Sequence, residues 1–182
     1  DSEGFALRRM FLKSPVRDAR LTSGFSKRRF HPILKRYRPH LGVDYGAPTG
    51  TPVRSVGNGR VTFAGQQRGY GNVIQIQHSG DRMTVYAHLS RIGVRMGQTI
   101  EQGQQIGNVG ATGWATGPHL HFEFKVSGRQ IDPMTIARAS ESTQLSTQAL
   151  AQFRQMATTI AQRLQSADQQ RLAASVSATR VE

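Results

Sequence analysis

Histidine is the residue type in this chain that is best suited to chemistry, because the sequence contains six histidines and no cysteine. The absence of cysteine excludes thiol nucleophiles and Cys-ligated zinc, so imidazole and carboxylate groups remain as metal ligands. His119 and His121 are separated by one residue in a stretch where polar and apolar residues alternate. Side chains two residues apart on a β-strand project from the same face, so this pair can reach one ion or one substrate.

A second candidate group is the segment HLGVD at His40–Asp44, in which an imidazole and a carboxylate lie four residues apart. Gly42 disfavours a helix, so we expect His40 and Asp44 at a turn that leads into a strand. Alone, this spacing is a weak indication of a metal site, because Asp44 could equally cap a turn. Combined with His121, the segment supplies two imidazoles and one carboxylate, the ligand count that leaves one position of a Zn²⁺ ion open for water.

His88 is a candidate for proton transfer at the end of the stretch Thr84–His88. An imidazole beside a metal-bound water can accept a proton or stabilise an oxyanion, whereas an ordinary strand-end histidine hydrogen-bonds to the backbone. Alternation predicts one face with Met83, Val85 and Ala87 and an opposite, polar face with Thr84, Tyr86 and His88. We interpret the two remaining histidines, His31 and His78, as structural or surface residues.

Motifs of other hydrolytic chemistries are absent from the sequence. It contains no His-Glu-x-x-His zinc motif, no Gly-x-Ser-x-Gly nucleophile elbow and no phosphate-binding loop with a lysine. No glutamate therefore stands in the usual place for activating a zinc-bound water, and any hydrolysis would depend on imidazole groups for this task.

The candidate residues lie in a segment of short apolar stretches and glycine-containing turns, from about Leu21 to Pro133. Asn58-Gly59 is typical of a two-residue β-hairpin turn. The stretches 73–77, 83–88 and 120–126 alternate apolar with polar residues, as half-buried strands do. The sequence therefore predicts a mostly β fold, with an antiparallel sheet whose polar face carries the histidines.

The C-terminal stretch has a different pattern, since residues 141–182 contain neither glycine nor proline. Apolar residues recur there at spacings of three and four, which predicts one amphipathic helix. They are Leu145, Ala149, Phe153, Met156, Ile160 and Leu164. Such a helix can pack on the β domain, lead to further sequence, or contact a partner or a second copy of the chain. We divide the chain into an N-terminal arm at 1–20, a β domain at 21–139 and a helical tail at 140–182.

The chain is strongly basic, with 24 Lys and Arg against 11 Asp and Glu and a formal charge of +13. The densest basic stretch is residues 27–38, which contain no acidic residue. A positive field of this kind attracts polyanions and anionic surfaces. Because the sequence shows no module that reads nucleic acid, we expect no nucleic-acid partner. Its apolar runs are too short for a transmembrane helix.

Taken together, the histidine-containing stretches resemble the zinc endopeptidases of the LytM/lysostaphin type, peptidase family M23. The resemblance rests on HLGVD at 40–44, YAHL at 86–89 and TGPHLHFE at 116–123, with GYGN at 69–72 among the supporting stretches. It implies that His40, Asp44 and His121 bind Zn²⁺ and that His88 and His119 form the catalytic pair. It leaves open which of these two is the general base, for which we favour His119.

The resemblance also implies a fold and a substrate. The fold would be an antiparallel open β-sandwich with a central groove, of the duplicated hybrid motif type, extended here by the C-terminal amphipathic helix and a short N-terminal arm. The enzyme would hydrolyse peptide cross-links or stems of peptidoglycan, outside the cytoplasm and specifically in the periplasm, with the basic surface drawn to anionic envelope polymers. The chain opens at Asp1 without a signal-peptide pattern, so we expect a trimmed chain, with any anchor in a segment outside it.

Two other functions remain to be weighed. The family includes members that have lost ligands and bind cell-wall amidases, so a latent or non-enzymatic module that regulates an amidase is the alternative function. The hairpins around 57–60 and 97–110 also look similar to a lipoyl- or biotin-type carrier. That function requires a lysine at a hairpin tip, and the sequence has no lysine between Lys35 and Lys125.

Overall fold

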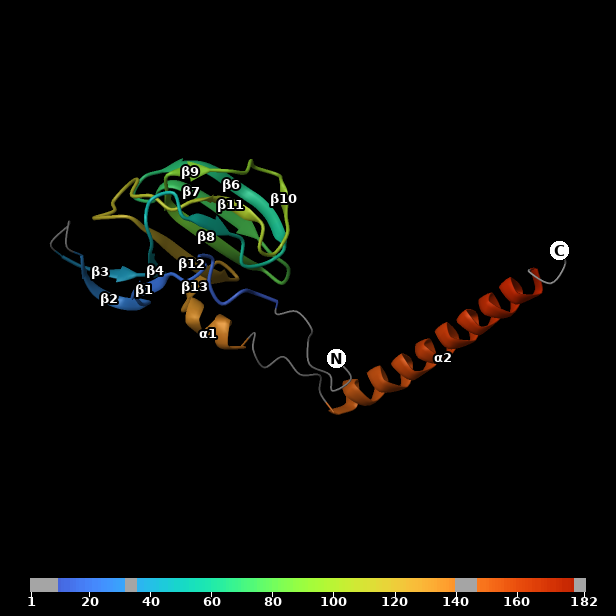
Figure 1. Ribbon diagram of the computed structural model, residues 1–182. Coiled ribbons are helices and arrows are strands. Elements are labelled where there is room, and N and C mark those ends of the chain that lie inside the picture. Colours follow the sequence, from blue (N-terminus) through green and yellow to red (C-terminus); the bar gives the residue numbers. More distant parts are fainter. Residues whose placement is uncertain (1–9, 32–35, 140–146, 179–182) are drawn as a thin grey trace. The chain divides into compact units, whose positions relative to one another are not determined.

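The computed structural model describes residues 10–31, 36–139 and 147–178 (Figure 1). The chain divides into two compact units, residues 9–141 and residues 1–8 with 142–182, and each is described by itself. The first unit contains β1 (Arg20–Ser23), β2 (Ser26–His31), β3 (Arg36–His40), β4 (Val43–Gly46), β5 (Pro52–Arg54), β6 (Gly59–Gln67), β7 (Gly71–Gln77), β8 (Arg82–Leu89), β9 (Arg91–Ile92), β10 (Thr99–Ile100), β11 (Gln105–Asn108), β12 (His119–Val126), β13 (Arg129–Ile131) and helix α1 (Pro133–Ala139). The second unit contains helix α2 (Thr147–Ala178).

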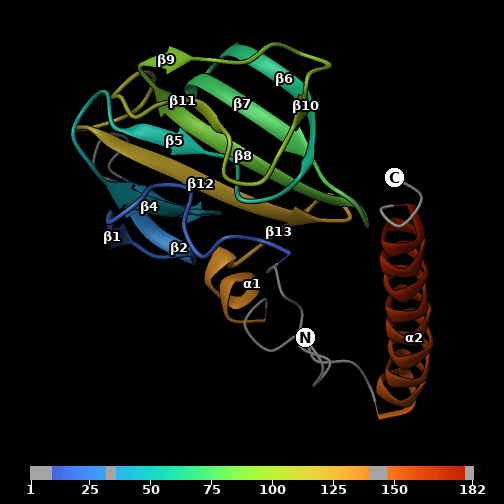
Figure 2. The ribbon, with the colours of Figure 1, turned by 45° about the vertical axis from the view of Figure 1, so that its right-hand side comes forward.

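The first unit is built from antiparallel strands in three sheets. The main sheet has the strand order β1-β4-β12-β8-β7-β6-β10, with β13 also paired to β12. Strands β5, β11 and β9 form a smaller sheet, and β2 pairs with β3 in a two-stranded ribbon. Figure 2 shows the smaller sheet beside the main one, with β12 and β8 crossing the middle of the unit. These pairings confirm the antiparallel β fold predicted from the sequence.

The main apolar core joins the two larger sheets. Val53 and Ile106 of the smaller sheet are buried in one cluster with Ile74, Tyr86 and Phe122 of the main sheet. A second, smaller cluster of Val73, Val85 and Ala87 is packed against Phe63 and Tyr70. Because neighbouring residues of a strand point to opposite faces, the two clusters lie on opposite faces of β7 and β8.

The predicted polar face of β8 is therefore wrong. Thr84 and Tyr86 are fully buried on the side of the main core rather than beside the histidines. The Tyr86 hydroxyl accepts a hydrogen bond from the Val56 amide at 3.1 Å and lies 3.0 Å from the Thr84 hydroxyl. Hydroxyl groups that are satisfied in this way are tolerated in a core, so a polar residue type does not by itself mark the exposed face.

Residues 10–19 contain no helix and lie along the β unit. Phe11 and Val16 belong to the main core, and Phe11 is only 3% exposed. The Phe11 ring makes edge-on contacts with Phe124 and His78, at centroid distances of 4.9 and 5.2 Å. His78 is buried and hydrogen-bonds to the Asn58 carbonyl and the Thr84 hydroxyl, both at 2.7 Å, as a structural histidine does. The side chain of His31 lies outside the described part of the structure.

The predicted C-terminal helix is present as α2, from Thr147 to Ala178, while Leu145 lies outside the described residues. Four of its apolar side chains are exposed: Phe153, Met156, Ile160 and Leu164. Neither described helix combines the length and the hydrophobicity that a membrane span requires.

Candidate metal centre

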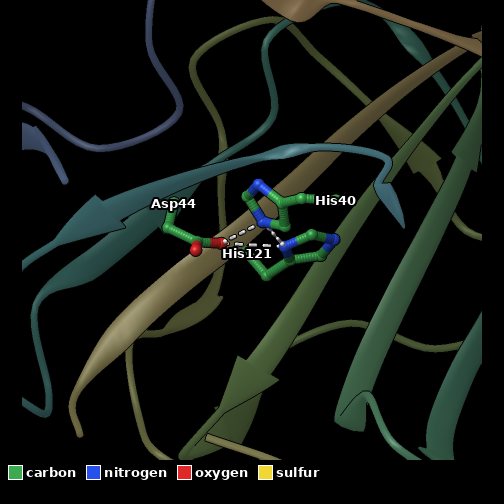
Figure 3. A group of neighbouring side chains, drawn as sticks. All are labelled: His40, Asp44 and His121. Atoms are coloured by element: carbon green, nitrogen blue, oxygen red, sulfur yellow. Dashed lines mark hydrogen bonds and ion pairs between the residues drawn. The ribbon is translucent and has the colours of Figure 1, made fainter. Parts of the chain in front are cut away.

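Three potential metal ligands converge on one point of the main sheet (Figure 3). The Asp44 Oδ1 atom lies 3.0 Å from His40 Nε2 and 2.8 Å from His121 Nδ1, and the two nitrogens are 3.2 Å apart. The pairing of β12 with β4 places His121 directly opposite Asp44, which explains how residues distant in sequence meet. Two imidazole nitrogens and one carboxylate oxygen form a donor set that suits a catalytic divalent cation such as Zn²⁺.

Both imidazoles of this cluster are oriented by a second hydrogen bond. His40 Nδ1 lies 2.7 Å from the Gly24 carbonyl oxygen, to which it can only donate, so Nε2 keeps its lone pair for a metal. His121 Nε2 lies 3.3 Å from Glu123 Oε1, so the other nitrogen, Nδ1, faces Asp44 and can bind a metal once its proton is lost. Partners of this kind fix the tautomer and the ring orientation of metal-binding histidines.

Gly42 is required by the close approach of β4 to β12. A Cβ atom at this position would lie 2.5 Å from the Phe122 carbonyl oxygen and 2.8 Å from Cε1 of the His121 ring. Any larger residue would therefore push against a candidate ligand. The sequence indicated only that Gly42 disfavours a helix; this steric role depends on the pairing of strands distant in sequence.

The ionisation of the metal-free cluster affects metal binding in two opposite ways: the carboxylate of Asp44 favours a cation, whereas a proton on His121 competes with it. Burial alone would raise the pKa of Asp44, but hydrogen bonds from His121 and His40 outweigh it and hold that pKa well below its usual range. Burial lowers the pKa of His121, yet hydrogen bonds to Asp44 and Glu123 prevail and raise it to about 9. Asp44 is thus an anion at neutral pH, and a metal that binds here must displace the proton on His121.

Glu123 and Tyr70 continue the hydrogen-bonded cluster from His121. Glu123 is 1% exposed, and the Tyr70 hydroxyl donates to its Oε1 at 2.5 Å. Burial acts to raise the pKa of Glu123, but hydrogen bonds from His121 and Tyr70 hold it below its usual value. Neither residue was predicted from the sequence to belong to the site. The available signal was that Glu123 follows His121 by two residues and so lies on the same strand face.

His88 and His119 lie next to the three candidate ligands. Their ring centroids are 4.8 Å apart, and His119 Nε2 is 3.9 Å from Asp44 Oδ1. His88 Nδ1 donates to the Thr112 carbonyl and His119 Nδ1 to the Gly117 carbonyl, each at 2.8 Å. The second nitrogen of each ring is therefore available to a substrate. Burial lowers the pKa of His88 to about 4, so this imidazole is neutral at pH 7.

His88 reaches this position through a β-bulge. From Asn72↔Leu89 to Ile74↔Tyr86, the register covers two residue steps on β7 and three on β8, so β8 contains one extra residue. His88 has a φ of 62°, in the left-handed region that non-glycine residues rarely adopt. Simple alternation would have placed His88 on the core side with Tyr86. Bulges commonly redirect a side chain next to a functional site.

The five residues line one hollow of about 650 Å³ in the β unit. Its walls also include Tyr70, Arg68, Trp114 and the loop 116–118 that precedes β12. The structure thus brings together all five site residues expected from the sequence, His40, Asp44, His88, His119 and His121. Among the described residues, His40, Asp44 and His121 form the group of His, Asp and Glu side chains that could hold a metal ion.

Residues 38–133 match the model of peptidase family M23, and this stretch covers more than half of the chain. The chain belongs to peptidase family M23. All five clustered residues lie within the matched M23 stretch, whereas Phe11 and helix α2 lie outside it.

Two curated M23-type relatives illustrate the similarity. "Peptidoglycan DD-endopeptidase ShyC" of Vibrio cholerae is 43% identical over 136 residues, which is 75% of this chain and 31% of the relative. "DD-carboxypeptidase/endopeptidase Mpg" of Neisseria meningitidis is 42% identical over 151 residues, 82% of this chain and 35% of the relative. The chain therefore spans about a third of the length of these relatives.

Solved structures confirm the M23 fold predicted from the sequence. A "zinc containing peptidase" from Vibrio cholerae shares 43% identity at a TM-score of 0.65, over 70% of this chain and 40% of that one. The catalytic domain of lysostaphin from Staphylococcus simulans shares 31% identity at a TM-score of 0.60, over 66% of this chain and 93% of that domain.

Proposed function

We propose that this chain is the catalytic part of a zinc endopeptidase that hydrolyses peptide cross-links or stems of peptidoglycan. The observation that carries the proposal is the convergence of His40, Asp44 and His121 beside two further imidazoles in one open hollow. The M23 membership and the names of the relatives, which are DD-endopeptidases and a zinc-containing peptidase, support this reaction class.

In this proposal His40, Asp44 and His121 hold the zinc ion, and His88 and His119 act on the substrate. Bound zinc would polarise the scissile carbonyl and lower the pKa of a water towards about 7. One imidazole then accepts the proton of the attacking water, and the other stabilises the tetrahedral oxyanion. The sequence favoured His119 as the base. The burial of His88, which keeps it neutral, is an argument for His88 in that role.

The test separates metal binding from proton transfer. We expect His121→Ala to lose both zinc and activity, because a ligand is removed. His119→Ala should retain zinc but digest purified sacculi at least about 100-fold more slowly, since general acid–base catalysis typically contributes this much. Elemental analysis measures the zinc, and mass spectrometry of the released fragments identifies the bond cleaved. A His119→Ala protein that digests sacculi as fast as wild type would contradict the mechanism.

The alternative, a latent or non-enzymatic module that regulates a cell-wall amidase, has less support. Degenerate members of the family lack ligands, whereas each of the five positions is filled here. The hollow also has exposed residues at its rim, among them Arg68, Trp114 and Pro118. A module that only binds a partner has no need of the complete set of five residues.

We further propose the location and the contacts of the chain. Peptidoglycan lies outside the cytoplasm, so the enzyme would act there, and specifically in the periplasm. Exposed basic residues such as Lys27 and Arg28 would attract anionic envelope polymers. The exposed apolar residues of α2 would contact a partner or a second copy. Analytical ultracentrifugation of the full chain and of a Met156→Glu variant would detect association with a second copy.

A further inference from the structure

A second hollow, of about 350 Å³, adjoins the hollow at the metal centre. The two share Arg68, Gly69 and Trp114 as lining residues. The walls of the second hollow otherwise consist of neutral groups, including Gln66, Gln67, Asn72 and Thr112. No acidic residue is among the described residues that line it. A peptide segment that reached from the metal centre into the second hollow would pass Arg68 and meet no acidic side chain among these lining residues.

Arg68 is the only lysine or arginine among the described residues that line either hollow. Its side chain is exposed and makes no hydrogen bond or ion pair with another residue of the described structure. The two acidic residues of the first hollow, Asp44 and Glu123, are instead hydrogen-bonded to imidazoles. Arg68 is thus a cation without a partner among the described residues, and it lies where the two hollows adjoin.

The position of Arg68 is coupled to the metal centre through the turn that follows it. Gly69 has a φ of 86°, and its carbonyl accepts a hydrogen bond from the Trp114 amide at 2.9 Å. The Trp114 ring lies against Gly69, where an added Cβ would be 3.5 Å from it. Tyr70 then turns inward to Glu123, which contacts the candidate ligand His121. The backbone that follows Arg68 is therefore tied to the candidate ligand His121 through Tyr70 and Glu123.

We propose that Arg68 binds a free carboxylate of the substrate, next to the scissile bond, and that the second hollow holds the peptide segment carrying it. This inference rests on the proposed function. It narrows the substrate to cross-links that carry a free carboxylate beside the scissile bond. A cross-link that ends in a diaminopimelate carries such a carboxylate, whereas a glycine bridge has none within it. An arginine can form two parallel hydrogen bonds to a carboxylate, which selects it over a neutral amide.

The test uses the full zinc-loaded chain and two cross-linked peptides that differ only in the free or amidated carboxylate beside the scissile bond. We expect wild type to prefer the free carboxylate. Arg68→Gln should raise KM for that peptide about tenfold, with kcat changed less than about threefold, and should leave the amidated peptide unaffected. Arg129→Gln is the matched control, because Arg129 is exposed and lines neither hollow. Its replacement changes the net charge by the same amount.

Binding of the released acceptor peptide, measured by calorimetry, tests the same contact without turnover. The preference for the free over the amidated product should disappear in Arg68→Gln and persist in Arg129→Gln. The inference is overturned if Arg68→Gln keeps the wild-type preference, or if wild type has none. If zinc-loaded wild type leaves both cross-linked peptides intact, the proposed function fails, and the calorimetric result still decides the role of Arg68.

Discussion

At the scale of single residues, the buried carboxylate of Glu123 orients the candidate ligand His121. Its oxygens lie 3.3 Å from His121 Nε2, 3.4 Å from Gln130 Nε2 and 3.5 Å from Lys125 Nζ, in addition to the Tyr70 hydroxyl. A buried carboxylate is tolerated only when it is paired in this way. Its contact with His121 Nε2 also keeps Nδ1 available as a ligand.

We predict that Glu123→Gln lowers the zinc affinity about 10- to 100-fold, because the amide loses the charge that orients His121. Competition with a chromophoric chelator at pH 7 measures the affinity. Lys125→Gln is the control, since Lys125 contacts the same carboxylate from the partly exposed side and should change the affinity less than about threefold. Wild-type affinity in Glu123→Gln would show that Glu123 does not orient the ligand.

The unusual backbone of His88 suggests a second variant. Asparagine tolerates a positive φ better than other non-glycine residues, and its amide can donate to the Thr112 carbonyl as the imidazole does. We predict that His88→Asn stays folded and keeps its zinc but loses at least about 100-fold in turnover, because no imidazole remains to transfer a proton or stabilise the oxyanion. Thermal unfolding, metal content and sacculus digestion check the three parts separately, and near-normal turnover would exclude His88 from catalysis.

At the scale of elements, the segment 10–19 completes the core although it precedes the matched family region. Phe11 covers Gly57, where an added Cβ would lie 2.7 Å from the Phe11 ring. The segment is also held by backbone bonds, since the Leu12 amide donates to the Val56 carbonyl at 2.8 Å. This part of the chain therefore contributes to folding rather than to chemistry.

Phe11→Ala should consequently lower the free energy of unfolding by about 3–5 kcal/mol, the usual effect of removing a buried phenylalanine. The neighbouring Met10→Ala is the control: Met10 is 53% exposed, so its replacement should cost less than about 0.5 kcal/mol. Urea denaturation followed by fluorescence measures both variants. Equal effects of the two substitutions would mean that the segment is not part of the folded core.

At the scale of the whole molecule, the described residues that form the candidate metal site and the main core all lie in the β unit. No described residue of α2 belongs to the main core cluster or lines either hollow. The candidate metal ligands, His40, Asp44 and His121, also lie outside α2. The tail is therefore expected to be separable from zinc binding and catalysis.

Deletion of residues 142–182 is predicted to leave the zinc stoichiometry unchanged and the turnover of a soluble cross-linked peptide within about twofold. The melting temperature of the β unit should also be retained, because its core stays complete. Parallel assays of the full and shortened chains with the same peptide provide the comparison. A large gain in turnover on deletion would instead favour the latent form of the enzyme.

The sequence was sufficient to predict features that depend on local spacing. The one-residue separation of His119 and His121 places both on one strand face, whatever the rest of the fold. The lack of cysteine restricted the ligands to imidazole and carboxylate, and the glycine-punctuated alternation indicated antiparallel strands. The grouping of His40 with Asp44 and His121 gained its specificity from the family resemblance, because the spacing alone was compatible with a turn cap.

Only the tertiary structure decided how distant segments meet. The register of β12 against β4 brings His121 to Asp44, 77 residues earlier in the chain, and the bulge in β8 turns His88 away from the core. Strand register and bulges arise from the simultaneous pairing and packing of several strands, so no single stretch encodes them. For the same reason the sequence assigned Thr84 and Tyr86 to the wrong face, and gave no site role to Tyr70 or Glu123.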